Sequence, residues 1–290
     1  MKKFALAAAV CVLSACTSTQ NDTPVTTGFD GEKLESILAV QDETSKARYE
    51  ARHPYETIQF MDIAPGMTVV ELLPGGGWYT KILLPYLGDE GTLIGVDYSL
   101  NMWPNFPFGT EDFINERQTW PQTWPEEAKP WGGEEGAEVQ AYTIDTLPES
   151  LYGTADRVLF IRALHNLARF EGNGQHLTQA LSQAYKLLKP GGLVGVVQHQ
   201  ASEDKSDAWA SGGKGYLKQS FVTQAMVNAG FEFVAESDIN KNPKDQPGEE
   251  DIVWRLPPSF YSSQDNSELR AQYEAIGESN RMTLLFRKPE

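Results

Sequence analysis

Short apolar runs alternate with amphipathic segments along most of the chain. Rich in valine, isoleucine and leucine, these runs predict buried strands at residues 68–73, 92–97, 139–144, 157–161, 193–198 and 231–236. Two stretches with helical spacing follow the fourth and fifth runs, one with Leu177, Leu181, Ala184 and Leu188, the other with Phe221, Ala225, Met226 and Ala229. Strands that alternate with helices are typical of a parallel sheet, so we expect a doubly wound α/β fold.

The segment from residue 100 to residue 138 interrupts this alternation. It carries four tryptophans (Trp103, Trp120, Trp124 and Trp131) together with five prolines. Because proline interrupts helices, this composition predicts an irregular insertion that is ordered by packing. Two interpretations stay open. The insertion could be a lid with aromatic walls at the ligand-binding edge of the sheet, or a surface excursion that its tryptophans anchor.

The first residues follow a different pattern. Two lysines precede an apolar run at residues 4–13, which is too short to span a bilayer and is typical of a secretion signal. Residues 13–16, Leu-Ser-Ala-Cys, resemble the bacterial lipobox, in which cleavage before the cysteine frees Cys16 for acylation. An ordinary signal peptide with an incidental cysteine is the alternative.

These features predict the organisation of the chain. We expect a lipoprotein signal in residues 1–16, a flexible tether in residues 17–28 and a single domain in residues 29–290. Acyl chains at Cys16 would hold the protein to the membrane. The predicted location is therefore the periplasmic side of a bacterial cell envelope.

Composition narrows the possible partners. Forty acidic residues against 24 basic ones give a net charge of −16, which would repel a phosphate backbone and counts against nucleic acid. Cys11 and Cys16 both lie in the signal, so the processed chain has no cysteine for disulfides, thiolate catalysis or zinc. Nothing in these patterns indicates an oligomeric state.

Three glycines follow the first predicted strand directly. Residues 69–78 read Val-Val-Glu-Leu-Leu-Pro-Gly-Gly-Gly-Trp, and glycines let the backbone approach a ligand closely where a helix begins. Asp97 ends the next predicted strand, 20 residues after Gly77, where a nucleoside-binding α/β unit places a carboxylate for ribose hydroxyls. Together these features predict a bound nucleoside.

Five segments resemble, in order, the successive motifs of class I S-adenosylmethionine-dependent methyltransferases: residues 69–87, 95–98, 145–147, 155–167 and 187–197. More narrowly, residues 74–80, 163–166 and 280–289 resemble a group of bacterial predicted methyltransferases without an assigned substrate. The resemblance runs from about residue 48 to residue 289. It implies a Rossmann-like methyltransferase fold, with a mostly parallel seven-stranded sheet and an antiparallel last strand at residues 282–287. It also implies S-adenosyl-L-methionine as the cofactor.

The resemblance implies cofactor contacts for the first loop. Glu71 would lie near the methionine part of the cofactor, and the backbone of Pro74, Gly75 and Gly77 would pass against it. Glu71 could instead cap a helix or pair with an arginine at position 48 or 52.

The same loop departs from the family pattern and from other nucleotide-binding loops. Leu73 replaces the usual first glycine, and we expect Gly76 to supply the flexibility that this replacement removes. Lysine is absent from residues 71–80, and Gly-x-Gly-x-x-Gly is missing. Both absences favour the methyl donor over ATP or NAD.

Three further residues are implied to contact the nucleoside. Asp97 would take both ribose hydroxyls, Tyr98 would pack on the adenine, and Asp145 would accept a hydrogen bond from the adenine amino group. Asp145 precedes Thr-Leu-Pro and could instead be a simple turn residue.

Two histidines are candidates for catalysis. Methyl transfer is an in-line displacement at an activated carbon, so a base is needed only where the acceptor must lose a proton. His165, after the fourth predicted strand, has an ordinary pKa suited to that step, and His199, at the end of the fifth, is the second candidate. Either could instead be a structural histidine. The two could also share a metal ion with a carboxylate, but no short-spaced ligand pair supports this, so we expect no metal.

The sequence thus predicts a lipid-anchored S-adenosylmethionine-dependent methyltransferase that acts on a small-molecule or envelope acceptor. The methyl donor is made in the cytoplasm, whereas the signal directs the chain outside it. The alternative is therefore a non-catalytic lipoprotein that binds a nucleoside or another metabolite in the same pocket. A Rossmann-type oxidoreductase is a second alternative.

Overall fold

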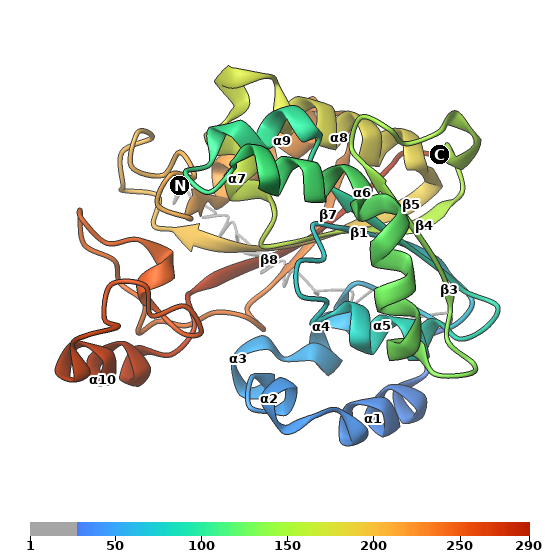
Figure 1. Cartoon of the computed structure of the whole chain (residues 1–290), viewed down its shortest axis with the longest axis horizontal. Coiled ribbons are helices and arrows are strands. Elements are labelled where there is room, and N and C mark those ends of the chain that lie inside the picture. Colours follow the sequence, from blue (N-terminus) through green and yellow to red (C-terminus); the bar gives the residue numbers. More distant parts are fainter. Residues whose placement is uncertain (1–27) are drawn as a thin grey trace, which may run out of the picture.

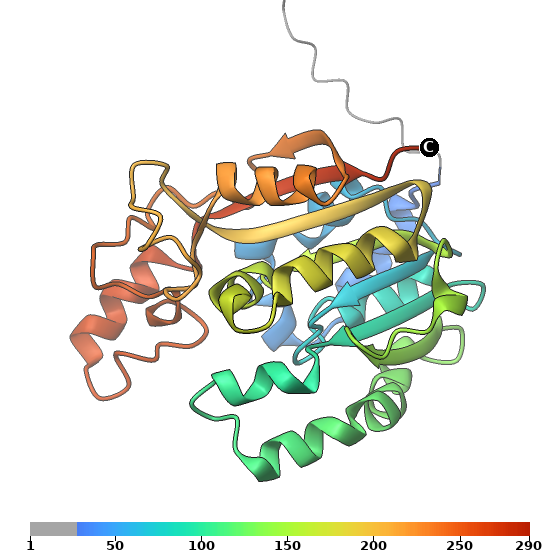
Figure 2. The ribbon, with the colours of Figure 1, turned by 90° about the horizontal axis from the view of Figure 1, so that it is seen from above.

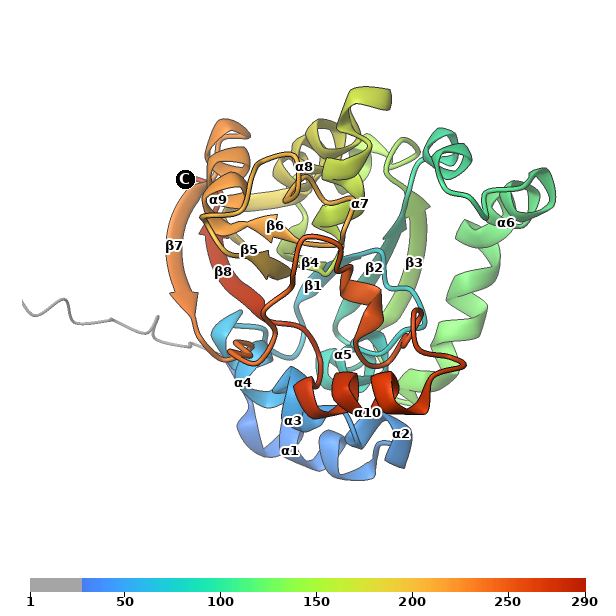
Figure 3. The same ribbon diagram turned by 90° about the vertical axis from the view of Figure 1, so that its left-hand side faces the viewer.

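The computed structural model describes residues 28–290, and within this range one sheet forms the centre of the molecule. Its strand order is β3-β2-β1-β4-β5-β8-β7, which can be followed from right to left in Figure 3. β8 runs antiparallel to both of its neighbours, β5 and β7, and the other pairs along this path are parallel. The doubly wound, mostly parallel sheet with an antiparallel last strand is confirmed. The strands are β1 (Thr68–Leu72), β2 (Thr92–Asp97), β3 (Glu138–Thr143), β4 (Ala155–Ile161), β5 (Leu188–Ala201), β7 (Glu232–Ser237), β8 (Arg281–Arg287) and the short β6 (Leu217–Lys218), which pairs with β5 beside this path.

The central strands are apolar runs because helices cover both faces of the sheet. β1, β2 and β4 are buried along nearly their whole length, as expected for strands in a doubly covered parallel sheet. One face carries α7 (Leu164–Arg169), α8 (His176–Leu187) and α9 (Gln219–Asn228), and the other carries α1 (Gly31–Val40), α4 (Pro54–Phe60) and α5 (Thr80–Leu87) (Figures 1 and 3). The remaining helices are α2 (Glu43–Lys46), α3 (Tyr49–Arg52), α6 (Glu111–Ala128) and α10 (Ser267–Ile276), with 3-10 turns η1 (Leu100–Asn105), η2 (Lys129–Gly132), η3 (Glu149–Leu151), η4 (Glu171–Asn173) and η5 (Val253–Arg255).

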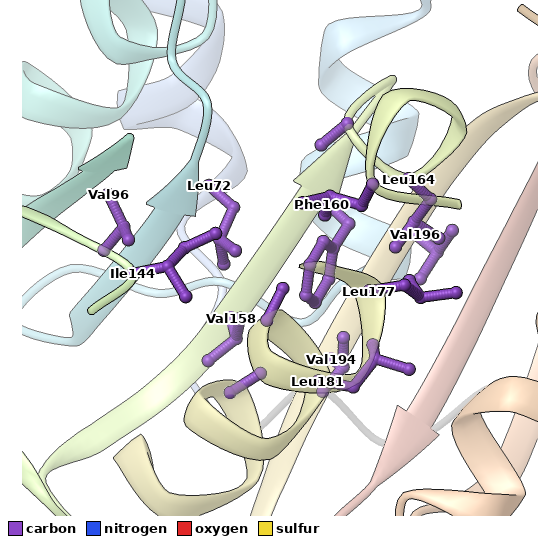
Figure 4. Close-up of a cluster of buried hydrophobic side chains, with 14 of the residues drawn as sticks. Leu72, Val96, Ile144, Val158, Phe160, Leu164, Leu177, Leu181, Val194 and Val196 are labelled. Atoms are coloured by element: carbon purple, nitrogen blue, oxygen red, sulfur yellow. The ribbon is translucent and has the colours of Figure 1, made fainter. Parts of the chain in front are cut away.

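A buried apolar cluster fixes the strand ends relative to α8. Phe160 of β4 and Val196 of β5 pack beneath Leu177 and Leu181 of α8 (Figure 4). The helical spacing of these leucines predicted this contact. Because β4 and β5 are held side by side in this way, the residues that follow them emerge at one edge of the sheet.

The insertion at residues 100–138 is helical, so the predicted irregular structure is wrong. α6 spans 18 residues with Pro121 and Pro125 inside it. Trp124 is buried, and its ring lies so close to Gly95 of β2 that a Cβ there would come within 2.4 Å of it. Tertiary packing of this side chain overrides the low helix propensity of the prolines.

One long connection lies beside the strand ends, and the first residues fall outside the described range. The connection between β7 and β8, residues 238–280, carries η5 and α10 and projects from the sheet (Figures 1 and 2). The predicted signal and lipobox at Cys16, and all but the last residue of the predicted tether, lie outside the described residues. Within residues 28–290, we find no helix long and apolar enough to cross a membrane.

Candidate functional site

A cavity of about 500 Å³ lies where β1, β4 and β5 end. The glycine loop forms one wall, the residues after β4 form another, and the connection between β7 and β8 forms a third. Several candidates from the sequence line it together: Pro74, Gly75, His165 and His199. The fold therefore brings the predicted loop and both predicted histidines to one place. Glu71, Gly77, Asp97, Tyr98 and Asp145 are not among its lining residues.

The glycine loop turns through three left-handed residues. Gly75 and Gly77 have φ of 56° and 73°, and Leu73 has φ of 58° although it carries a side chain. The expectation that Gly76 supplies the flexibility lost at position 73 is wrong, because Leu73 itself adopts the left-handed conformation. That conformation costs a non-glycine residue roughly 1 kcal/mol or more, so the surrounding structure must hold it. A Cβ at Gly76 would meet nothing within 4 Å, so this part of the loop faces open space.

Glu71 lies beneath the loop and does not reach the cavity. Its carboxyl group accepts a hydrogen bond of 2.7 Å from the Thr80 hydroxyl at the start of α5. Burial raises the pKa of Glu71 to about 7, and the Thr80 hydrogen bond and Arg162 only partly oppose this. It pairs with neither Arg48 nor Arg52, and it joins the end of β1 to the start of α5.

The residues implied to hold the nucleoside are engaged by the insertion. The Asp97 carboxylate forms an ion pair of 3.3 Å with Arg117 of α6, and it also accepts the backbone N–H of Tyr98 at 2.8 Å. Burial raises the pKa of Asp97, and these two contacts oppose that effect. The ring of Tyr98 packs edge-on against Trp103, with centroids 5.0 Å apart. In the structure, side chains of the insertion therefore take the contacts implied for ribose and adenine.

Asp145 follows β3, whose last residue Thr143 pairs with Asp97 of β2. It is exposed, just after β3, and accepts a hydrogen bond of 2.7 Å from the Thr143 hydroxyl. This is the geometry of the turn residue that the sequence left as the alternative.

The tautomer of His165 follows from its neighbour. The amide nitrogen of Gln198 donates to the carbonyl of Gly215 at 3.0 Å, so its oxygen faces His165 Nδ1 at 3.4 Å. Nδ1 therefore carries the proton and Nε2 has a free lone pair. Burial lowers the pKa of His165 to about 4, with Arg162 contributing, so the ring is neutral near pH 7.

His199 is hydrogen-bonded through Ser279. The Ser279 hydroxyl accepts a hydrogen bond of 3.3 Å from Arg281 and is 2.5 Å from His199 Nδ1. A hydroxyl has a second lone pair as well as its proton, so it can pair with Nδ1 in either tautomer of the ring. Burial, the neighbouring His165 and then Arg281 lower the pKa of His199 well below its ordinary value. The centroids of the His165 and His199 rings lie 5.4 Å apart.

Arginines around Glu278 form the part of the site that sequence reasoning missed. Three arginines bind the Glu278 carboxylate: Arg48, just before α3, Arg52 of α3 and Arg281 of β8. Burial raises the pKa of Glu278, but Arg281, Arg52 and Arg48 outweigh it and hold the pKa at about 2. The sequence held one signal. Like charges at positions 48 and 52, four residues apart, repel each other on a helix, so a carboxylate near both could have been expected.

Arg162 is the fourth arginine of the cavity. It directly follows β4 in a left-handed conformation, with φ of 58°, and its backbone N–H donates to Val197 at 2.6 Å. Within residues 28–290 we find no hydrogen bond or ion pair for its guanidinium group. Burial, together with Arg52 and Arg281, lowers its pKa to about 9. Also within this range, no three histidine, cysteine, aspartate or glutamate residues gather as a metal site.

Comparisons with known proteins give a likeness in fold. No family model matches the chain, and no curated protein matches it. It is similar to the crystal structure of an S-adenosylmethionine-dependent methyltransferase from Aquifex aeolicus, at 14% identity over 90% of this chain and 99% of that one, with a TM-score of 0.48. A geranyl diphosphate methyltransferase in complex with S-adenosylmethionine gives 13% identity over 89% and 91%, with a TM-score of 0.49. A putative methyltransferase from Bacillus halodurans gives 16% identity over 82% and 100%, with a TM-score of 0.47. At these values the functional assignment rests on this chain's own residues.

Proposed function

We propose that this protein is an S-adenosylmethionine-dependent methyltransferase that acts on a small-molecule or envelope acceptor in the cavity at the ends of β1, β4 and β5. The observation that carries the proposal is the meeting of the glycine loop with His165 and His199 around one cavity. The sheet order places this cavity where open α/β sheets bind their ligands.

The residues fit the cofactor once the insertion gives up its contacts with Asp97 and Tyr98. The loop at Gly75 and Gly76 leaves room for the methionine part, and Asp97 would take the ribose hydroxyls in place of Arg117. The Arg117 side chain is 31% exposed, and an ion pair of this kind contributes about 0–1 kcal/mol. Hydrogen bonds to a charged carboxylate contribute about 1.5–3 kcal/mol. Ribose hydroxyls can therefore displace Arg117 from Asp97. The bound cofactor supplies an activated methyl group.

The histidines would handle the proton of the acceptor. The free lone pair on Nε2 of His165 can accept a proton from an acceptor hydroxyl or amine as the methyl group arrives. A ring nitrogen of His199 can hydrogen-bond to the same acceptor atom or its neighbour. Because His165 is neutral near pH 7, it is ready to accept a proton.

One observation favours the alternative of a non-catalytic metabolite-binding lipoprotein. The insertion packs against Tyr98 and holds Asp97 through Arg117, so the nucleoside end is closed in the structure. A protein that binds another ligand near the histidines has no need to open it.

Donor binding and turnover separate the two functions. We expect S-adenosylmethionine to bind the purified protein in calorimetry, and Asp97→Ala to weaken binding by about 1–3 kcal/mol, because ribose hydroxyls lose their partner. Asp89→Ala is the matched control, because Asp89 is exposed and precedes β2, at the opposite end of that strand. Tight donor binding without labelled product from envelope extracts would favour the binding protein, and an absence of donor binding would refute the methyltransferase.

The envelope location belongs to the proposal as well. It depends on acylation at Cys16, and intact-mass analysis of the mature protein tests it. A Cys16→Ser chain that keeps the same lipid mass would refute the anchor.

A further inference from the structure

We propose that the cavity recognises a small molecule by an oxyanion, a carboxylate or a phosphate group, which Arg162 and Arg52 hold. Under the methyltransferase function proposed above, on which this inference rests, the oxyanion belongs to the methyl acceptor.

The charges around the cavity are unbalanced. Its lining residues include four arginines and one acidic residue, Glu278. His165 and His199 add no positive charge near pH 7, because burial lowers the pKa of both. The site is therefore cationic in a chain whose net charge is −16. A concentrated charge of the opposite sign to the rest of the protein attracts an anion into this cavity in particular.

Hydrogen-bond donors are also in excess. One carboxylate serves three guanidinium groups, each of which has several N–H donors. Arg52 reaches Glu278 through Nε, and its two terminal nitrogens have no partner within the described residues, although the side chain is only 4% exposed. Arg162 has no side-chain partner in the same range. The Arg52 guanidinium group also stacks over the Trp78 ring, 4.6 Å from its centroid, and Arg162 is half-buried, so both groups line the cavity with N–H donors left to offer. A planar oxyanion satisfies two such donors at once.

The backbone at Arg162 supports a role in binding. Its left-handed φ of 58° is unfavourable for a residue with a side chain, and Leu73, which follows the neighbouring strand β1 and also lines the cavity, has the same φ. Conformations of this kind gather where a side chain must be aimed at a ligand. The strain therefore coincides with the cationic part of the cavity.

The size and the other walls of the cavity indicate the rest of the ligand. A volume of about 500 Å³ suits a small molecule. Ile161, Trp254 and Leu256 provide apolar surface beside the arginines. The expected ligand thus has an apolar body and an anionic end.

An anionic acceptor would also solve two problems of the reaction. The methyl donor carries a sulfonium cation, and an anionic acceptor would offset the repulsion between that cation and the arginines. Arg162 also contributes to the low pKa of His165, so an anion paired with Arg162 would make His165 a stronger base. Binding of the acceptor would in this way balance the charge of the cavity and make His165 more basic.

Titration of simple oxyanions into the full-length protein, without methyl donor, tests the proposal. Inorganic phosphate and succinate are titrated separately at constant ionic strength and followed by calorimetry. We expect at least one of them to bind, and which one binds identifies the group. Arg162→Gln should weaken this binding about tenfold or more. Arg169→Gln, which removes an exposed arginine at the end of α7, should leave it unchanged.

Further measurements cover the remaining outcomes. If Arg162→Gln does not fold, the melting temperature of the wild-type protein replaces it: a rise in phosphate or succinate, relative to chloride, supports the site. Binding of neither anion, or equal binding by wild type and a folded Arg162→Gln, overturns the proposal. Competition between the anion and S-adenosylmethionine also overturns it, because the arginines would then hold the carboxylate of the donor. Failure of the methyltransferase function would show instead as an absence of donor binding.

Discussion

Replacing Glu71 by glutamine should remove a pH dependence from the stability of the fold. Glu71 is buried and accepts a hydrogen bond from Thr80, and burial raises its pKa from 4.5 to about 7. Its folded state therefore keeps a proton that the unfolded chain releases at lower pH. The stability that this protonated carboxyl group provides is complete below about pH 4.5 and is lost as the pH rises to about 7.

The magnitude follows from these two pKa values. One pKa unit corresponds to about 1.4 kcal/mol, so the interval from 4.5 to about 7 amounts to roughly 3 kcal/mol. Glutamine has no proton to lose, and its amide oxygen can still accept from Thr80. The difference in unfolding free energy, Glu71→Gln minus wild type, should thus increase by roughly 3 kcal/mol across this interval and stay constant above it.

Urea unfolding followed by tryptophan fluorescence measures this difference at a series of pH values. Glu149→Gln is the control, because Glu149 is exposed on η3, and its difference from wild type should be nearly flat. Titrations of other groups cancel, since only the difference between variant and wild type is used. If the difference for Glu71→Gln is the same at about pH 4.5 and about pH 8, the carboxyl group is not held protonated and the reasoning is refuted.

Two further substitutions test the loop and the proposed base. Gly77→Ala should lower the unfolding free energy by about 1–3 kcal/mol in the same urea assay, because φ is 73° and a Cβ would lie 2.3 Å from the Trp131 ring; unchanged stability would contradict this geometry. His165→Asn should slow methyl turnover while the dissociation constant of the donor stays nearly constant, and a loss of folding would instead indicate a structural histidine.

The fold was largely predictable because the strands are nearly continuous apolar runs. β1 and β2 lie within a residue of their predicted bounds. β5 begins earlier than predicted, since Leu188 pairs with Ala155 before a shift in register, and the intervening Lys-Pro-Gly-Gly looks like a turn. α6 was missed because its prolines argue against a helix, whereas the burial of Trp124 stabilises one.

The site residues that could be predicted are those that lie at or directly after the end of a predicted strand in the sequence. The glycine loop and the two histidines each come at a strand end, so their sequence context revealed them. Arg48 and Arg281 do not follow a strand, and only the folded sheet brings them together. Arg162 does follow β4, but nothing in the sequence places it beside the other arginines. That Arg117 of the insertion would hold Asp97 also depends on packing that no local pattern describes.

Glu278 joins parts of the chain that are far apart in sequence, since its partner Arg48 lies 230 positions away. The cation cluster therefore exists only after β8 has inserted between β5 and β7, and closing such long loops is among the slow steps of folding. A partly folded chain without β8 in place would retain the glycine loop and both histidines but would lack the ordered arginines. A ligand held by these arginines would bind only the fully folded chain. By mass action it would therefore stabilise the state in which β8 is paired. Occupancy of the cavity would then serve as a measure of how completely the chain has assembled.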